Sequence, residues 1–303
     1  MLARLLNDFI YAVSFSTALW PNIPFPRSRL PHWRLPWHTT GGIPQQTYDE
    51  LVRYTQYSSA VYQPLCPNPL GNALVTEFTN LLTGVHGFVA RDDEREEVVV
   101  AFRGSQQIPD MFTDANMILI PLDSVVTPAN GSDDARVHAG FGVAFGSVGD
   151  LVLDTVTEQL REHPAYTVIL TGHSMGGALA AIGGAMIKSN TTEAYVRVFT
   201  FGQPRTGNAA FADLLEELVG SENLYRAVHT WDGVPAIIPQ SLGYRHHSTE
   251  YWNFQEPPNR KNVRRCTGQE DPACSSSIPS TGINVAHDVY FGQVMTTDAT
   301  LCL

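Results

Sequence analysis

A serine flanked by glycines, between an apolar run and a stretch of very small residues, leaves this chain few folds to adopt. The segment is Gly172-His173-Ser174-Met175-Gly176-Gly177, preceded by the apolar run 168–170 and followed by alanines as far as residue 181. In a G-x-S-x-G turn the positions around the serine must be nearly free of side chains, so that strand and helix approach closely and the hydroxyl projects from the sheet. The pattern therefore predicts a nucleophile elbow carrying Ser174. A plain glycine turn is the alternative.

Short β-rich runs alternate with helical patterns around this turn. The β-rich runs are 87–91, 98–102, 167–170, 196–201 and 225–229, and helical spacing of apolar residues covers 148–160, 175–188 and 208–219. Strands that alternate with helices indicate an α/β fold with a largely parallel central sheet.

The amino-terminal part has the composition of a processed leader. Residues 1–18 resemble a short signal peptide, with Arg4 ahead of an apolar stretch that ends in small residues. Residues 19–45 are rich in proline and lack acidic side chains, which is typical of an extended leader or pro-segment. Thr47 and Glu50 form a capping box before Leu51, so we expect a single ordered domain over residues 46–303.

Cysteines and sequons point to the oxidising side of a membrane. The chain has four cysteines, and 130–132 and 190–192 are N-glycosylation sequons, which together favour a secreted, extracellular protein. Four cysteines allow three connectivities. We favour Cys266 with Cys274, which closes a short loop, and Cys66 with Cys302, which ties the chain's end to its first third. Four reduced core cysteines are the alternative.

The charge balance argues against nucleic acid as a partner. With 19 basic and 30 acidic side chains among 303 residues the formal net charge is −11, whereas nucleic acid and anionic bilayers are bound by clustered Lys and Arg. The longest run without charge, 163–187, contains Pro164 and five glycines, and it predicts a buried strand-turn-helix rather than a transmembrane segment. We take a monomer as the default.

A serine hydroxyl needs an imidazole to take its proton and a carboxylate to orient that imidazole. In an α/β-hydrolase chain the acid and then the histidine follow the serine. Asp232 is favoured as the acid because it comes just after the end of the run 225–229, at the sheet edge where open α/β sheets place their chemistry. The other downstream aspartates considered are Asp213, Asp271, Asp288 and Asp298, and the downstream histidines are His229, His246, His247 and His287.

The oxyanion of an acyl-transfer intermediate needs two N–H donors. Met175 supplies one, because its amide lies at the start of the helix that follows Ser174. The second is expected from the loop after the run 98–102, where Gly104 permits close backbone approach and Ser105 offers an N–H and a hydroxyl. An ordinary glycine turn is again the alternative.

Taken together, these segments resemble the fungal class 3 lipases, an α/β-hydrolase family that also contains type A feruloyl esterases and some phospholipases. The matching segments follow the family's order and are 99–105, 137–141, 171–179, 199–208, 225–235, 250–252 and 287–292. The resemblance implies an α/β-hydrolase fold, with a mostly parallel central sheet flanked by helices and a short lid.

The resemblance also implies roles for individual residues. It gives Ser174, Asp232 and His287 the triad roles, and it assigns the oxyanion hole to Ser105 and Met175. The family tolerates the favoured cysteine pairing, and neither a metal nor an organic cofactor is implied.

By the same resemblance, a lid follows the oxyanion serine. Its apolar side chains, Ile108, Pro109, Met111 and Phe112, are suited either to contact with a lipid interface or to plugging the closed site. Met111 stands where the family often has tryptophan, a departure that weakens the case for strong interfacial activation.

The resulting expectation is a secreted serine ester hydrolase that forms an acyl-enzyme. A triacylglycerol lipase acting on esters at a lipid–water interface is the favoured hypothesis. A feruloyl-type or other soluble-ester carboxylesterase is the alternative, because the segment from Asp232 to Pro235 is closer to the feruloyl type. A non-catalytic binding protein on the same fold is a second alternative, since a fold alone proves no activity.

Overall fold

The structure is a computed structural model that describes residues 42–105, 117–126, 133–280 and 282–303. Several sequence predictions lie outside these residues. They are the signal peptide, most of the proline-rich leader, the sequon 130–132, and the lid residues Ile108, Pro109, Met111 and Phe112.

In the described part, helices and strands alternate as predicted. In chain order they are α1 (Gln45–Ala60), β1 (Ala73–Asn80), β2 (Val85–Asp92), β3 (Glu97–Phe102), β4 (Leu119–Pro121), β5 (Arg136–His138), α3 (Ala139–Gly146), α4 (Gly149–Glu162), β6 (Thr167–His173), α5 (Met175–Asn190), β7 (Val196–Phe201), β8 (Gly207–Asn208), α6 (Ala209–Val219), β9 (Leu224–His229), β10 (Tyr244–Arg245), β11 (Glu250–Asn253), β12 (Val263–Cys266), β13 (Val289–Tyr290) and β14 (Gln293–Val294).

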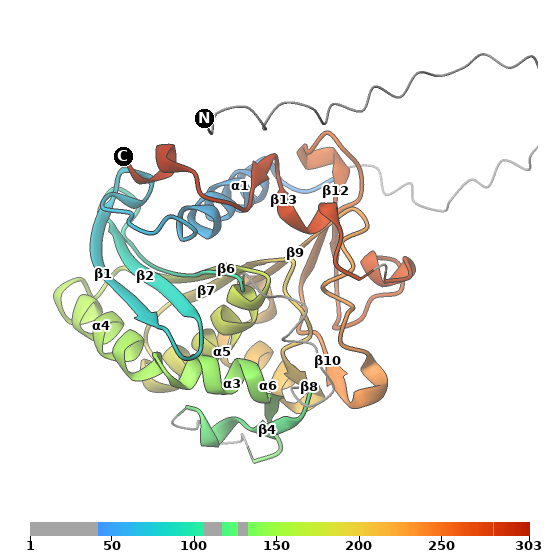
Figure 1. Ribbon diagram of the computed structural model, residues 1–303, viewed down its shortest axis with the longest axis horizontal. Helices are drawn as coiled ribbons and strands as arrows, with labels where there is room; N and C mark the ends of the chain where they lie inside the picture. Colours follow the sequence, from blue (N-terminus) through green and yellow to red (C-terminus); the bar gives the residue numbers. More distant parts are fainter. Residues whose placement is uncertain (1–41, 106–116, 127–132, 281) are drawn as a thin grey trace, which may run out of the picture. The chain divides into compact units, whose positions relative to one another are not determined.

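An eight-stranded sheet in the order β1-β2-β3-β6-β7-β9-β11-β12 forms the centre of the fold (Figure 1). The five strands from β3 to β11 are parallel, whereas β1, β2 and β12 run antiparallel to their neighbours. The strand β5 belongs to a second, four-stranded sheet with the order β10-β8-β5-β4. The mostly parallel α/β-hydrolase sheet expected from the sequence is confirmed.

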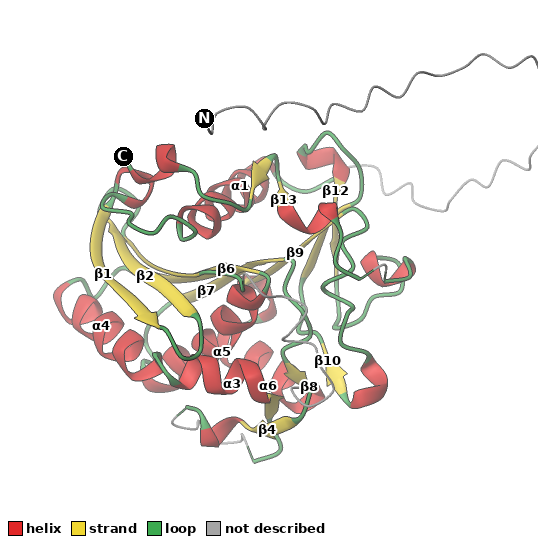
Figure 2. Cartoon of the chain, viewed as in Figure 1, coloured by secondary structure: helices red, strands yellow, loops and turns green. Residues whose placement is uncertain are grey.

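Helices cover both faces of the central sheet, with α1 on one face and α3, α4, α5 and α6 on the other (Figure 2). The strand β3 shows how the sequence supports two cores. Its Val98 and Val100 pack with the α5 side, whereas Val99 and Ala101 pack with the α1 side, against residues such as Tyr54. All are buried, as expected for a parallel strand covered on both faces.

The predicted capping box at the first helix is wrong. The helix α1 already begins at Gln45, with Pro44 at its N-cap and no side-chain cap. The Glu50 carboxylate is instead engaged by Arg197, whose Nη2 donates to Oε2 at 2.7 Å. The side chain that the local pattern assigns to the cap thus forms a partly buried ion pair with Arg197 of β7.

The long uncharged run forms β6, the elbow and α5, which are almost entirely buried, so the predicted strand-turn-helix is confirmed. No single helix in the described residues is long and apolar enough to cross a membrane. The helices α3 and α4, which are bent by 54° relative to each other, together have the length and apolar composition of a membrane span.

Both favoured disulfides are present. Cys66 is bonded to Cys302, and Cys266 is bonded to Cys274. The first fastens the end of the chain beside α1, and the second closes a loop after β12.

Candidate active site

Ser174 lies in the sharp turn between β6 and α5, in a backbone conformation that few non-glycine residues adopt. Its φ is 57° and its ψ is −126°. The neighbouring glycines are required by close contact, because a Cβ on Gly172 would overlap the backbone of Gly176, and one on Gly176 would overlap the carbonyl of Phe102. The geometry is therefore that of a nucleophile elbow.

Asp232 and His287 meet from two distant parts of the chain. Asp232 follows β9, and His287 lies in a short 3₁₀ helix, Val285–Asp288. The His287 Nδ1 atom is 2.9 Å from Asp232 Oδ2, and both side chains are buried. Among the described residues the opposite nitrogen, Nε2, has no hydrogen-bond partner. This leaves an oriented imidazole with one nitrogen available for proton transfer.

The Asp232 carboxylate has two further donors. The Val234 N–H donates to Oδ1 at 2.9 Å, and the Tyr290 hydroxyl donates to Oδ2. Burial, followed by the nearby Asp232 charge, raises the pKa of Tyr290 well above its usual range, so the phenol remains a donor. Tyr290 was missed in the sequence, although it lies only three residues after His287, because a buried tyrosine in a short strand has the pattern of a core residue.

The elbow lies beside both the imidazole and the upstream loop. His173, next to Ser174, packs its ring against His287 with the ring centroids 4.4 Å apart. On the other side, a Cβ on Gly104 would come within 3.2 Å of the Ser174 Cβ. Ser105 follows directly, and Met175 opens α5. The structure thus places the segments that carry the five predicted residues next to one another, and the roles of these residues in the triad and the oxyanion hole stay predictions.

The other downstream histidines are engaged elsewhere. His229 Nδ1 is 2.8 Å from the Ala286 carbonyl, and His246 Nδ1 is 3.1 Å from Glu270. His247 Nδ1 donates to the Ser248 carbonyl at 2.6 Å. Burial, with the Arg226 charge nearby, lowers the pKa of both His246 and His247 to about 3. The neutral, buried rings of His246 and His247 hold loops in place.

The competing aspartates also have local roles. Asp213 lies in α6 and accepts from Gln269, and Asp298 caps the last 3₁₀ helix. Asp288 follows His287 in its 3₁₀ helix, and Asp271 accepts from the Ala273 N–H.

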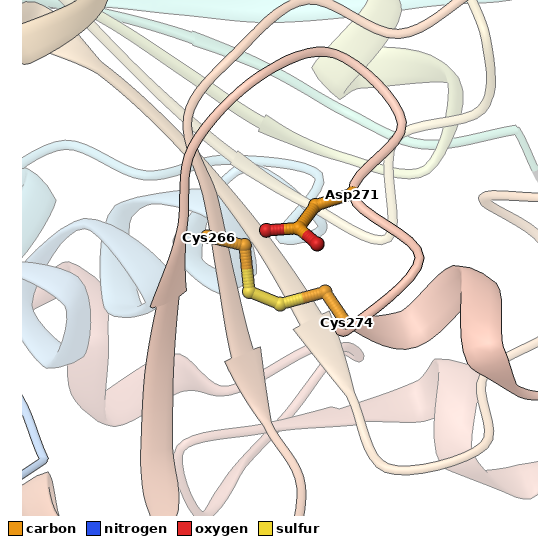
Figure 3. Close-up of side chains that lie close together, drawn as sticks. All are labelled: Cys266, Asp271 and Cys274. Carbon is orange, nitrogen blue, oxygen red and sulfur yellow. A yellow bond between two sulfur atoms is a disulfide. The ribbon is translucent and has the colours of Figure 1, made fainter. Parts of the chain in front are cut away.

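Within the described residues, one group of three side chains has the spacing of metal ligands: Cys266, Asp271 and Cys274. Figure 3 shows the two sulfur atoms bonded to each other, with the Asp271 carboxylate beside them. A metal-binding cysteine must be a thiolate, and a disulfide offers none. We therefore assign these residues to the disulfide loop.

The sheet, the elbow and the buried Asp–His pair together define an α/β-hydrolase. The family profile described as Lipase (class 3) matches residues 99–242. The chain is 30% identical over 262 residues to the secreted mono- and diacylglycerol lipase 1 of Fusarium solani, covering 82% of this chain and 75% of that protein. The chain therefore belongs to the class 3 lipase family, a family of carboxylic ester hydrolases, and the resemblance seen in the sequence is confirmed.

Two further comparisons agree. A lipase of Rhizopus niveus is 36% identical over 223 residues, which cover 72% of this chain but only 54% of that protein, so the match spans about half of its length. The crystal structure of a triacylglycerol lipase from Penicillium expansum superposes with a TM-score of 0.77 at 26% identity, covering 85% of this chain and 98% of that one.

Proposed function

We propose that this protein is a secreted triacylglycerol lipase in which Ser174, Asp232 and His287 form the catalytic triad. The observation that carries the proposal is the buried His287–Asp232 pair, with its unpartnered Nε2, beside a strained serine elbow. Family membership supports the same roles.

The chemistry is acyl transfer in two steps. His287 Nε2 takes the proton of Ser174, and Oγ attacks the ester carbonyl. The N–H groups of Ser105 and Met175 stabilise the tetrahedral oxyanion, and the alcohol leaves with the proton held by His287. Water then attacks the acyl-enzyme in the same way. Asp232 keeps the imidazole in the tautomer with Nδ1 protonated throughout.

Two exposed apolar surfaces support action at a lipid–water interface. The first, the hairpin patch, comprises Leu81, Leu82, Ile118 and Val143. Leu81 and Leu82 are 91% and 98% exposed at the tip of the β1–β2 hairpin. Gly87 of β2 pairs with Phe102 of β3, so this tip lies at the sheet edge from which the Ser105 loop leaves.

The parts of the hairpin patch are physically connected, and one charged side chain, Arg103, reaches the hairpin tip, where its Nη2 donates to the Gly84 carbonyl at 3.3 Å. The hydroxyls of Thr83 and Ser147, 3.0 Å apart, link the hairpin tip to the end of α3, and the Ile118 carbonyl accepts from the first N–H of α3 at 2.8 Å. The segments 78–90 and 137–149 contain no Asp, Glu, Lys or Arg. Two adjacent leucines at a turn tip, where polar residues are usual, are suited to insertion into a neutral lipid surface.

The second surface, the tryptophan patch, flanks the triad on its histidine side. It comprises Trp231, Ile283 and Val285, which are all exposed. The Asn284 side chain donates to the Trp231 carbonyl at 3.0 Å and holds the two segments together. Apolar surfaces next to both Ser105 and His287 favour a lipid substrate over a soluble ester.

One observation favours the soluble-ester alternative. The sequence Asp232-Gly-Val-Pro235 is closer to the feruloyl esterase type than to the commonest lipase sequence. A series of glycerol esters from acetate to oleate, with methyl ferulate alongside, separates the two. We expect turnover of long-chain esters to rise once substrate exceeds its solubility. Ferulate turnover without that rise would replace the lipase assignment by the esterase.

The nucleophile is tested by Ser174→Ala. We expect tributyrin hydrolysis to fall by at least about 10³-fold while the melting temperature stays close to that of the wild type. Unchanged hydrolysis would refute Ser174 as nucleophile. A Ser189→Ala variant, which removes a hydroxyl at the opposite end of α5 from Ser174, serves as the matched control.

Secretion is supported by the two disulfides and by the named secretion of the Fusarium solani relative. Expression of the full chain in a fungal host tests it. We expect the protein in the medium with its amino terminus cleaved near residue 18. Retention of the intact amino terminus inside the cells would contradict it.

A further inference from the structure

Two side chains that the mechanism does not use connect the oxyanion loop to the base. The Tyr62 hydroxyl is 2.8 Å from His173 Nδ1, and His173 Nε2 is 2.8 Å from the main-chain carbonyl oxygen of His287. The backbone of Gly104 packs against the same Tyr62 hydroxyl, which a Cβ on this glycine would overlap. Tyr62 is half-buried just beyond α1, whereas His173 is fully enclosed at the end of β6.

The protons of this connection are ordered in one direction. A carbonyl oxygen only accepts hydrogen bonds, so His173 Nε2 must be protonated and donates a hydrogen bond to the main-chain carbonyl of His287. Burial, followed by the neighbouring His287 ring, lowers the pKa of His173 well below its usual value, so the imidazole is neutral and Nδ1 is an acceptor. Tyr62 therefore donates to Nδ1.

This chain of hydrogen bonds has one end at the Gly104 loop and the other at the backbone of His287. At one end, a Cβ on Gly104 would overlap the Tyr62 hydroxyl and approach Ser174 Cβ to 3.2 Å, so the loop is packed directly against both side chains. At the other end, the His287 N–H donates to the Asn284 carbonyl at 3.0 Å, and its carbonyl accepts from His173.

We propose that Tyr62 and His173 are positioning residues that fix the oxyanion loop and the His287 backbone relative to Ser174. Asp232 orients the His287 ring, whereas this chain of hydrogen bonds holds the main chain that carries the ring. Its neutral state also keeps a second positive charge away from His287 while that imidazole holds the serine proton. The inference rests on the proposed triad and deepens it.

The first test is Tyr62→Phe, which removes one oxygen atom and keeps the ring. We expect kcat for a soluble short-chain ester, 4-nitrophenyl butyrate, to fall about 10- to 100-fold, with KM changed less than about threefold, because the bound ester is contacted by other groups while the reacting atoms lose their alignment. The matched control is Tyr57→Phe. The Tyr57 hydroxyl is also partnered, by Asn72 at 2.8 Å, but it is remote from the oxyanion loop, so its loss should leave kcat unchanged.

The second test is rescue at His173. Glutamine offers an amide N–H for the His287 carbonyl and an oxygen for Tyr62, whereas leucine has similar bulk and neither group. We expect His173→Gln to retain at least tenfold more kcat than His173→Leu. Combining Tyr62→Phe with His173→Leu should cost little more than His173→Leu alone, because both break one chain.

Each result has a distinct meaning. Hydrolysis by the wild type that disappears in Ser174→Ala tests the proposed nucleophile. The ratios of kcat among the Tyr62 and His173 variants test the chain of hydrogen bonds separately. Equal kcat in wild type and Tyr62→Phe, or full additivity in the double variant, would overturn the proposal. A readout independent of activity is ¹⁵N NMR of the His173 ring, which should show the neutral form protonated at Nε2 between pH 6 and 8. A ring protonated at Nδ1 would also overturn it.

Discussion

Acidification should destabilise this protein through His138, and the size of the effect follows from its surroundings. His138 ends β5 and is the N-cap of α3, where its Nδ1 accepts the Phe141 N–H at 3.3 Å. The ring is fully buried and stacks on Phe141 with centroids 4.1 Å apart. Burial lowers the pKa of His138 to about 4, from an ordinary value near 6.5.

The direction in which pH changes the free energy of unfolding follows from proton linkage. Below pH 6.5 the unfolded chain binds a proton at this residue that the folded protein excludes, so stability is fully present above pH 6.5 and is lost as the pH falls towards 4. Each pH unit in that window is worth about 1.4 kcal/mol, which gives about 3 kcal/mol in total and about 2 kcal/mol between pH 7 and pH 5.

The assay is urea unfolding at pH 7 and pH 5, with disulfides intact, for wild type and His138→Asn. Asparagine also accepts an N–H at an N-cap but does not titrate. We expect the free energy of unfolding of the wild type to fall by about 2 kcal/mol more than that of the variant between the two pH values. His246 and His247 affect both proteins alike, so the difference isolates His138. Identical pH dependence in the two proteins would refute the reasoning.

Three further outcomes are expected. Tyr290→Phe removes a hydrogen bond to the buried Asp232 carboxylate. The free energy of unfolding, measured with urea, should fall by about 1.5–3 kcal/mol, and kcat should fall as well. If neither value changes, the hydrogen bond contributes neither to stability nor to catalysis. Gly176→Ala places a methyl group against the Phe102 carbonyl and should destabilise the protein by about 3 kcal/mol. Gly146→Ala in α3 should not, because its methyl group would meet Val125 only at van der Waals distance, 3.7 Å from the carbonyl oxygen. Equal melting temperatures of the two variants would contradict this. Replacing Leu81 and Leu82 by serine should lower the affinity for phosphatidylcholine vesicles, measured by co-sedimentation, at least tenfold. Turnover of 4-nitrophenyl butyrate should stay normal. Unchanged vesicle binding would show that the hairpin patch does not contact the lipid.

Much of the site could be predicted from the sequence because its parts are signalled locally. The elbow at Ser174 needs glycines at fixed offsets, and Asp232 follows a recognisable strand. Tyr62 and Tyr290 hydrogen-bond to partners 111 and 58 residues away, so these contacts depend on sheet order and loop packing that no local pattern specifies. The cap at Glu50 failed for the same reason, because a distant arginine competes for the carboxylate.

The Cys66–Cys302 bond has a consequence for how the protein survives damage. It turns the chain between these residues into a covalent ring, with a sequence separation of 236, that contains Ser174, Asp232 and His287. A protease that cuts one exposed loop inside the ring opens it without releasing either piece, so the three residues stay on a single linked molecule. By the loop-entropy relation, closing a ring of this size disfavours the unfolded chain by about 5 kcal/mol. A single cut inside the ring therefore leaves a molecule that still carries all three residues on one covalently connected chain.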